Sequence, residues 1–354
     1  MQRPLRWLPV FLALSGPLAA QRMFALDSSR AVYEIDLTTA ARTQVGTISS
    51  NAGVTGGFTY DANTGRLWLT STGNDSVYLV DITNWSATLV GNYGLGTTVV
   101  MHGIEWDSST NTLYAMSQHN GGLYTVDQTS GSATLLGTTG VAGFGNLAYD
   151  PLFNVLYMTS SGTDSLYTLD RATGVPTLIG PMGAGTTNSN GFAYNIDNQT
   201  LYMADNLTDN LYSLDATMGA ATVIGSTAST NLLGLVYVPG AGRLSRAVHG
   251  CGPTTIKVTG HPAIGATIET TLGATTALPF IGYGVTNLGL PFCGCTIGHE
   301  WTVAVAGPTS SFTLPANPVL VGVQLFIQGT DFLGAGGCGD PLLTLTDTIT
   351  VTIG

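Results

Sequence analysis

Three residues in one segment have side chains suited to proton transfer or metal binding. His102 and Glu105 fall within residues 101–106, and His119 falls within residues 117–121. Imidazole and carboxyl groups together suit general acid–base chemistry or a metal site. His102 and Glu105 are three positions apart on an expected strand, however, so their side chains point to opposite faces of it. One segment also supplies too few metal ligands, so we favour a polar filler or a ligand-contacting pair over a catalytic centre.

Aspartate and asparagine residues gather in several expected loops and raise the possibility of bound Ca²⁺. This ion prefers carboxylate, carbonyl and amide oxygens. Three of the aspartates occupy one repeated position just before a strand, which favours a role in turns instead. No ligand set of fixed spacing appears, so Ca²⁺ is a possible cofactor without an assigned site. The candidate binding-face residues are Asp75, Asp164, Asp205, Asp209 and Asn190.

The elements that position these residues belong to a pattern that recurs five times. Each copy contains Tyr-x-x-Asp, with successive tyrosines 45, 46, 43 and 45 residues apart, and ends in a Thr-containing strand closed by Gly. Because every copy has the aspartate, we interpret it as an acceptor for turn backbone N–H groups. The repeated aromatic residues are interpreted as packing between units. The repeated residues are Tyr33, Tyr78, Tyr124, Tyr167 and Tyr212; Asp36, Asp81, Asp127, Asp170 and Asp215; and Gly46, Gly91, Gly137, Gly180 and Gly225.

A period of 40 to 50 residues with four short strands is typical of a β-propeller blade. We name the strands of a blade a, b, c and d in chain order. The chain starts with a b strand, and the fifth a strand comes last, at residues 234–237. The two ends therefore complete one blade together, which predicts a five-bladed propeller over residues 21–240. We expect function on the face formed by the d–a and b–c loops, where the blades differ.

These repeats resemble those of secreted bacterial β-propellers, in which Leu-Tyr-x-x-Asp is followed by a threonine strand ending in glycine. They are similar in style to the YVTN, NHL and quinoprotein-like repeats. The resemblance covers about 215 residues and implies the propeller fold. It does not imply one function, because such propellers serve as binding scaffolds, lyases, lactonases and hydrolases alike.

Composition changes after a Gly/Pro-rich joint, which we expect to be a linker over residues 241–253. Residues 254–354 alternate Thr, Val and Ile and contain several short strands with Gly/Pro turns. This pattern predicts a small β-sandwich, so the fold class is all-β throughout. The segment 320–328 and the terminal Thr-Val-Thr-Ile-Gly resemble a C-terminal module of planctomycete-type secreted proteins.

The N-terminus is typical of a secretory signal over residues 1–20. Arg3 and Arg6 precede an apolar run over 7–14, and small residues precede Gln21. The run is too short to span a bilayer, although a retained anchor is the alternative. We expect a secreted or cell-surface protein, or a periplasmic one, with no transmembrane segment after cleavage.

Four cysteines, Cys251, Cys293, Cys295 and Cys338, lie in the last third of the chain. In an exported protein an even, clustered set predicts disulfides, and zinc binding is the alternative. The one-residue gap between Cys293 and Cys295 is tighter than the usual spacing of zinc ligands. We expect these two cysteines to pair with Cys251 and Cys338, in an order that the sequence leaves open.

The amino-acid composition limits the functions that this protein can have. A net charge of −11, with 10 basic residues against 21 acidic ones, excludes an electrostatic nucleic-acid binder. The sequence therefore favours an extracellular binding or scaffold propeller that presents its loop face to a polysaccharide or protein, with a C-terminal attachment or sorting module. Whether it is an enzyme is left open; the alternative is a divalent-cation-dependent propeller hydrolase or lyase using His102, Glu105 and the loop carboxylates.

Overall fold

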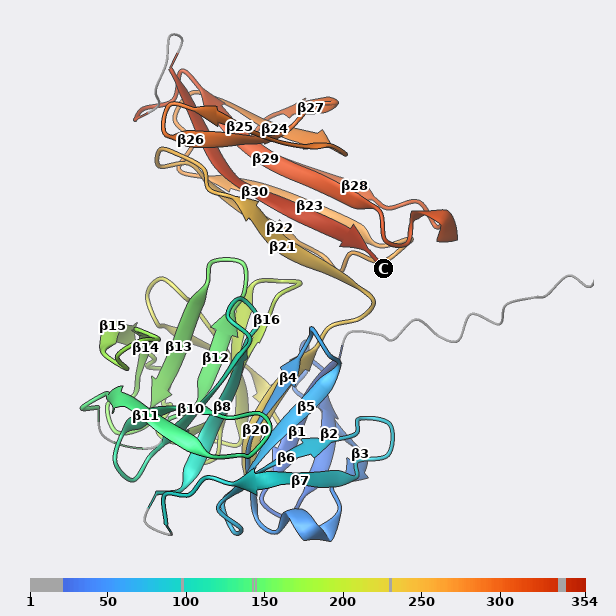
Figure 1. The fold of residues 1–354 in the computed structure, drawn as a ribbon. Helices are drawn as coiled ribbons and strands as arrows, with labels where there is room; N and C mark the ends of the chain where they lie inside the picture. The colour runs from blue at the N-terminus through green and yellow to red at the C-terminus, as the bar shows by residue number, and fades with distance from the viewer. Residues whose placement is uncertain (1–21, 97–98, 142, 144, 229–230, 337–341) are drawn as a thin grey trace, which may run out of the picture.

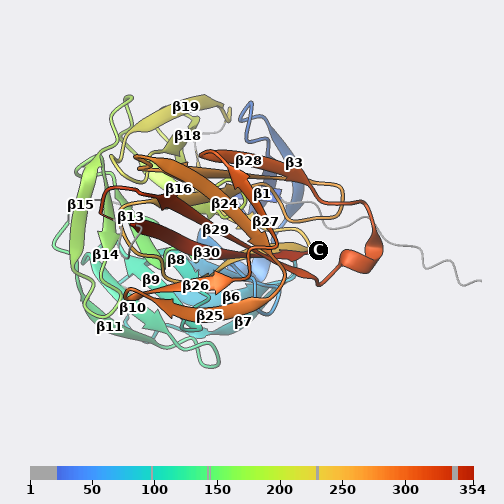
Figure 2. The same ribbon diagram turned by 90° about the horizontal axis from the view of Figure 1, so that it is seen from above.

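The computed structural model describes residues 22–96, 99–141, 143, 145–228, 231–336 and 342–354. Figure 1 shows two bodies of β-strands, a propeller and a sandwich, and Figure 2 shows the sandwich lying over the propeller. Two short 3-10 turns accompany the strands, η1 (Ser50–Ala52) and η2 (Pro318–Leu320). Among these residues no helix has the length and apolar character needed to cross a membrane. The expected signal over residues 1–20 lies outside the described residues.

The propeller consists of five four-stranded antiparallel sheets, as the sequence predicted. Their inner strands a contact one another in a closed ring.

In the order a to d, blade 1 is β20 (Leu232–Val238), β1 (Arg22–Asp27), β2 (Ala31–Ile35) and β3 (Arg42–Thr47). Blade 2 is β4 (Thr55–Asp61), β5 (Arg66–Ser71), β6 (Ser76–Val80) and β7 (Ala87–Asn92). Blade 3 is β8 (Met101–Asp107), β9 (Thr112–Ser117), β10 (Gly122–Val126) and β11 (Ala133–Thr138). Blade 4 is β12 (Leu147–Asp150), β13 (Val155–Ser160), β14 (Ser165–Leu169) and β15 (Pro176–Pro181). Blade 5 is β16 (Ser189–Asn195), β17 (Thr200–Asp205), β18 (Asn210–Leu214) and β19 (Ala221–Ser226).

The two ends of the propeller share blade 1, which confirms the predicted ring closure. Strand β20 pairs with β1 in antiparallel register, with Tyr237 opposite Met23 and Gly234 opposite Leu26. The pairing hides an edge that either strand alone would leave open.

The repeated glycine of strand d allows adjacent blades to approach closely. A β-carbon on Gly91 would lie 1.8 Å from the carbonyl oxygen of Ser130, in the c–d turn of the next blade. Gly137, Gly180 and Gly225 likewise meet a backbone carbonyl in the c–d turn of the next blade, and for Gly225 of blade 5 this is Thr39 of blade 1. Gly46 meets the side chain of Trp85 in the c–d turn of blade 2. A larger side chain at any of these positions would push two blades apart, which gives the repeated glycine its physical reason.

The repeated Tyr-x-x-Asp aspartates act in turns, as predicted. The Asp81 carboxylate, for example, accepts the Thr83 backbone N–H at 2.8 Å and the Thr83 hydroxyl at 2.7 Å. Such bonds hold the pKa of Asp36 at about 2, chiefly through the hydroxyl and backbone N–H of Thr38. All five c–d turns are thus closed by the side chain that precedes them.

The second body is a β-sandwich of a five-stranded and a three-stranded sheet with an added hairpin. The larger sheet has the order β21 (Gly242–Val248), β30 (Leu343–Ile353), β29 (Gln324–Phe332), β24 (Leu278–Gly284) and β27 (Val303–Ala306). The smaller sheet has the order β22 (Thr255–Thr259), β23 (Thr267–Gly273) and β28 (Thr309–Thr313). The hairpin is β25 (Asn287–Phe292) and β26 (Cys295–His299). Buried residues of both sheets, such as Ile268 and Ile349, form one core.

The expected linker over residues 241–253 is wrong over most of its length. Residues 242–248 form β21, which pairs with the C-terminal strand β30. Because β30 supplies a long partner strand, the joint between the bodies shrinks to the few residues between β20 and β21. Cys251, which follows β21, forms a disulfide with Cys295 of β26. This bridge agrees with the predicted pairing across the Cys-Gly-Cys motif, and Cys338 lies outside the described residues.

Candidate functional site

The sandwich contacts the a–b turns of the propeller. In the a–b turn of blade 5, the Asp197 carbonyl accepts the Gly260 N–H at 2.6 Å, and the Gln199 side chain donates to the Val258 carbonyl at 2.6 Å. The Asp197 carboxylate also lies 2.9 Å from the His261 imidazole. The d–a and b–c loops lie at the other end of the propeller, away from the sandwich, as the η1 loop of Figure 1 shows. The face on which we expected function is therefore the open one.

The loop aspartates of this face are bound into the turns that carry them. The Asp205 carboxylate accepts four backbone N–H groups, from Thr187, Asn188, Leu207 and Thr208. Burial alone would raise the pKa of Asp205, but these four donors outweigh it and lower the pKa.

The three remaining candidate aspartates share one conformation. Asp75, Asp164 and Asp209 have left-handed backbones, with φ of 49°, 46° and 56°. Each backbone carbonyl accepts an N–H from the d–a loop, at 3.1, 2.8 and 2.8 Å. One carboxylate oxygen of each is buried without a hydrogen-bond partner among the described residues. They come from three separate blades, which supports the turn interpretation that their common position suggested.

Asn190, the last of the binding-face candidates, faces the channel with its backbone carbonyl. Its side-chain amide donates to Asn188. Its backbone carbonyl accepts a hydrogen bond from the Asn146 side chain. Asn190 therefore belongs to the inner lining of the face.

His102 lies at the loop end of β8, in contact with the b–c loop of its own blade. Its Nε2 lies 2.5 Å from the Gln118 amide, and its Nδ1 lies 3.4 Å from the Val100 carbonyl. The His119 ring centroid is 6.2 Å away. Burial, more than the nearby His119, lowers the pKa of His102 to about 4, so the imidazole is neutral at physiological pH.

Glu105 extends instead into the central channel, toward the sandwich. One carboxyl oxygen accepts the Thr59 hydroxyl of the neighbouring blade at 3.0 Å. Burial raises the pKa of Glu105 to about 8, although the Thr59 hydroxyl and a backbone N–H lower it. At neutral pH this side chain is a carboxylic acid. Among the described residues no group of three or more His, Cys, Asp or Glu side chains could hold a metal ion.

An asparagine that is not among the sequence-predicted site residues lies in the channel. Four blades have Gly at the start of strand a, namely Gly57, Gly103, Gly191 and Gly234, whereas blade 4 has Asn146. The Asn146 side chain, which is 3% exposed, donates to the Asn190 carbonyl and, at 3.3 Å, to the Leu233 carbonyl. The asparagine at a position where the other blades have glycine is the signal by which the sequence could have identified this residue. The amide occupies space that the glycines leave open and joins three blades across the axis.

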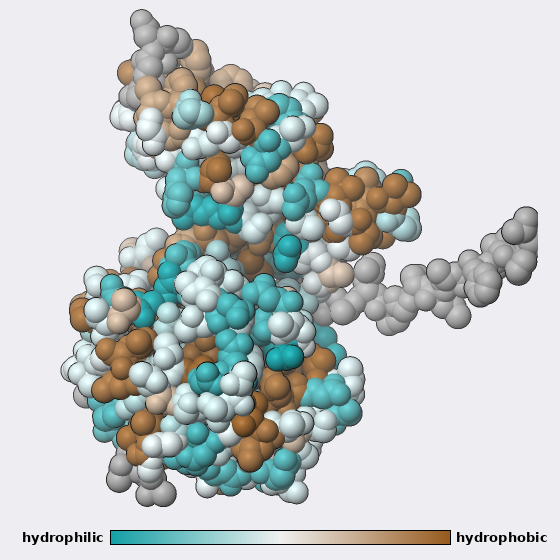
Figure 3. Space-filling model, in the orientation of Figure 1, coloured by the Kyte–Doolittle hydropathy of each residue, from teal (hydrophilic) through white to brown (hydrophobic). Residues whose placement is uncertain are grey.

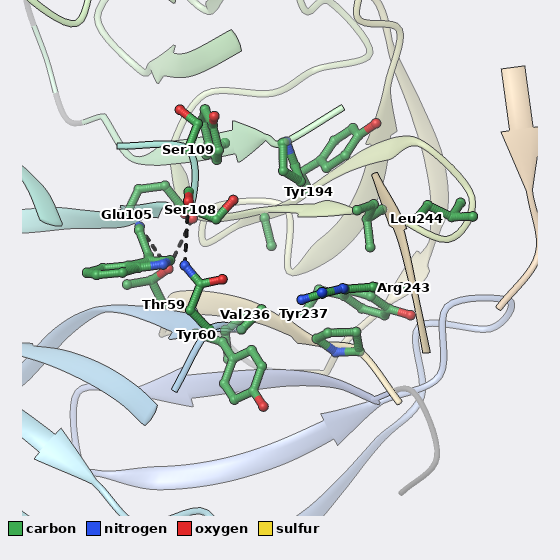
Figure 4. A pocket seen from close by; sticks show the side chains of 18 of the residues that line it. Thr59, Tyr60, Glu105, Ser108, Ser109, Tyr194, Val236, Tyr237, Arg243 and Leu244 are labelled. Carbon is green, nitrogen blue, oxygen red and sulfur yellow. Dashed lines mark hydrogen bonds between the residues drawn. The ribbon is translucent and has the colours of Figure 1, made fainter. Parts of the chain in front are cut away.

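Beyond Glu105 the channel opens into a cavity of about 340 Å³ beneath the sandwich. Figure 4 shows Glu105, Tyr60, Tyr194 and Tyr237 around it, with Arg243 arriving from the sandwich side. The aromatic residue of strand a in every blade lines this cavity: Tyr60, Trp106, Tyr149, Tyr194 and Tyr237. These rings also pack in the blade cores, as predicted. The sequence could not reveal the cavity, because its roof is β21, which was expected to be a linker.

No protein-family model matches the chain, and a search of curated proteins finds no match. Several solved structures are similar. The nidogen/laminin complex aligns at a TM-score of 0.47 and 13% identity, over 62% of this chain and 98% of that one. A calcium-binding protein, regucalcin, from Agrobacterium tumefaciens str. C58 aligns at a TM-score of 0.41 and 13% identity, over 72% and 83%. A gluconolactonase from Xanthomonas campestris aligns at a TM-score of 0.41 and 14% identity, over 60% and 78%. At these scores the similarities carry no argument about function, and the five sheets of this chain establish its propeller on their own.

Proposed function

We propose that this protein is an extracellular, non-enzymatic binding protein whose propeller presents the d–a and b–c loop face to a protein partner. The observation that carries the proposal is the seating of the sandwich on the a–b turns, which leaves the loop face open. The sandwich then serves as the attachment module. The Cys251–Cys295 disulfide supports an oxidising, extracellular location.

The open face favours a protein over a polysaccharide as the partner. Leu207 is 70% exposed and Val54 is 49% exposed on two of its loops. Polysaccharide sites commonly expose aromatic rings for stacking. Among the described aromatic residues, only Phe153 and Phe332 reach 37% exposure, and neither lies on this face. Apolar anchors surrounded by polar residues are typical of protein interfaces.

The contacts of the candidate residues do not support the alternative function, a cation-dependent hydrolase or lyase. His102 contacts Gln118 at one end of β8, whereas Glu105 accepts a bond from Thr59 inside the channel. The loop carboxylate of Asp205 is already engaged by four backbone N–H groups. These candidates therefore have separate local roles, and Ca²⁺ binding stays a prediction of the sequence.

The test is capture of extracellular proteins by the immobilised full-length protein, followed by affinity measurement with the purified captured partner. The double variant Val54→Asp/Leu207→Asp should weaken that affinity at least about tenfold, because charges replace apolar contacts at the interface. A matched control is Leu89→Asp/Leu178→Asp on the outer strands β7 and β15, where both leucines are more than half exposed. The control should bind as the unmodified protein does.

A glycan array and a hydrolase panel, each with and without a chelator, run beside the capture experiment. Equal binding by the loop-face variant and its control would overturn the assignment of the face. Binding of glycans that is lost in the loop-face variant would identify a polysaccharide partner instead. Turnover that disappears with the chelator would replace the binding proposal with the enzymatic alternative.

A further inference from the structure

The cavity at the channel mouth lies on the side of the propeller opposite the proposed partner face. Its floor is formed by Glu105 and Thr59, and Arg243 of β21 contributes from the sandwich. At about 340 Å³ it lies near the lower end of the range of small-ligand pockets, about 300–1,000 Å³. Figure 3 shows hydrophobic residues in the recess between the two bodies. The cavity thus has the size and partial enclosure of a site for one small molecule.

Six aromatic residues line the cavity, beside aliphatic and small polar ones. Trp106, Tyr149 and Tyr237 are 3%, 5% and 7% exposed, whereas Tyr60 and Tyr194 are half-buried and border the open space. Aromatic rings present apolar faces with polar edges. Such rings suit ligands that have apolar C–H faces and hydroxyl edges.

The polar groups of the cavity include both donors and acceptors. The Trp106 indole N–H is buried and has no hydrogen-bond partner among the described residues. Arg243 is exposed and likewise has no hydrogen-bond or ion-pair partner there. The second guanidinium, that of Arg246, is engaged 3.0 Å from Asp347. The Trp106 nitrogen is closed off from the cavity, whereas the exposed Arg243 guanidinium can donate to a hydroxyl oxygen of a ligand.

The protonation state of Glu105, on the floor of the cavity, limits the kinds of ligand that can bind. Burial raises the pKa of Glu105 to about 8, so the floor is an uncharged carboxylic acid at neutral pH. The other ionisable groups around it are Asp107 on its own strand, the tyrosines of strands a, and Arg243 and Arg246 on β21. Burial also raises the pKa of Tyr60, Tyr149 and Tyr194, so these hydroxyls stay protonated. Glu105 is therefore the cavity group whose charge changes between pH 6 and 9.

We propose that the mouth cavity is a binding site for a neutral sugar residue, held against the Tyr194 ring with its hydroxyls on Glu105 and Arg243. The site is separate from the partner face, and either proposal can hold without the other. The protonated Glu105 both donates and accepts a hydrogen bond, as a sugar hydroxyl does. Ionisation of Glu105 removes its donor and places a charge beside the ligand, so binding weakens as pH rises through about 8.

The experiment measures binding of free neutral sugars by saturation-transfer NMR on the full chain, with calorimetry on those that bind. The probes are glucose, galactose, mannose, N-acetylglucosamine and their β1,4-linked disaccharides, with glucuronate and galacturonate as charged counterparts. Tyr194→Ala should lower affinity about tenfold. Phe332→Ala, an exposed aromatic truncation in the sandwich, is its matched control and should leave affinity unchanged.

Glu105→Gln tests whether Glu105 contacts the ligand, because a purely structural role would not change how the affinity depends on pH. Affinity of the wild type should fall between pH 7 and 9.5, whereas the Gln variant, which cannot ionise, should keep a flat profile. Glu269→Gln on the exposed face of β23 should retain the wild-type profile. The site is overturned if no neutral sugar binds, if uronates bind better than neutral sugars, or if Tyr194→Ala and Phe332→Ala behave alike. Parallel pH profiles in the wild type and Glu105→Gln would also overturn it.

Discussion

Met23 of β1 lies opposite Tyr237 of β20, so the first and last strands of the propeller complete the same blade. The five residues Leu232, Leu235, Val236, Tyr237 and Val238 of β20 are each less than 9% exposed. Closure of the ring and formation of the blade 1 core are therefore one event.

Removal of residues from 231 onward should abolish cooperative folding, whereas a chain ending at Gly240 should keep a folded propeller. At about 1.5–3 kcal/mol for each buried side chain, loss of β20 removes about 10 kcal/mol. That is comparable with the whole stability of a domain, about 5–15 kcal/mol. Calorimetric melting of the two truncations checks this expectation. Equal melting would show that closure does not depend on β20.

Among the polar residues of the channel, Asn146 should cause the largest loss of stability when it is substituted. Asn146→Ala removes the donor to the Asn190 and Leu233 carbonyls and should cost about 1–3 kcal/mol in urea unfolding. Asn146→Asp should cost more at pH 7, since a carboxylate would face two carbonyl oxygens, and should regain stability as the pH falls. Asn63→Ala, in the exposed a–b turn of blade 2, is the control and should change stability by less than about 0.5 kcal/mol. Similar losses in the alanine variants would contradict the bridging role.

The stability of the protein should decrease below pH 6.5 partly because of His102. Its pKa is lowered from 6.5 to about 4 in the folded state, so the unfolded chain binds more protons between these values. The stabilisation is present above pH 6.5 and is lost as the pH falls toward 4. At about 1.4 kcal/mol per pKa unit, the loss is at most about 3.5 kcal/mol.

Urea unfolding of His102→Gln between pH 4 and 7 checks this expectation. The variant should show a shallower loss than the wild type, because glutamine keeps a polar side chain that cannot be protonated. His249→Gln, at an exposed position of the sandwich, should follow the wild type. Identical slopes for all three proteins would contradict a buried neutral imidazole.

Mass mapping without reduction should recover a peptide pair joined through Cys251 and Cys295. Cys293 and Cys338 are the remaining two cysteines, and we expect them to form the second pair. Cys251→Ser/Cys295→Ser should lower the melting temperature of the sandwich, because an unfolded chain closed by a 44-residue separation regains entropy when opened. Four alkylatable thiols in the native protein, or stoichiometric zinc, would contradict both pairs.

The sequence by itself determined the blades. The period of 43 to 46 residues, the Tyr-x-x-Asp turns and the late strand at residues 234–237 record contacts made within a blade or between neighbours. Such contacts repeat identically, so they leave a periodic signal. The strand-d glycines belong to the same class, since each meets the c–d turn of the next blade.

Only the tertiary structure decided what lies at the centre and between the bodies. Asn146 crosses to carbonyls of two other blades, and Glu105 owes its raised pKa to burial beside Thr59 of a neighbouring blade. The strand β21 exists because β30, at the far end of the chain, pairs with it. These contacts occur once, between residues far apart in sequence, so no local pattern can encode them. Ring closure and the docking of the sandwich bring them together.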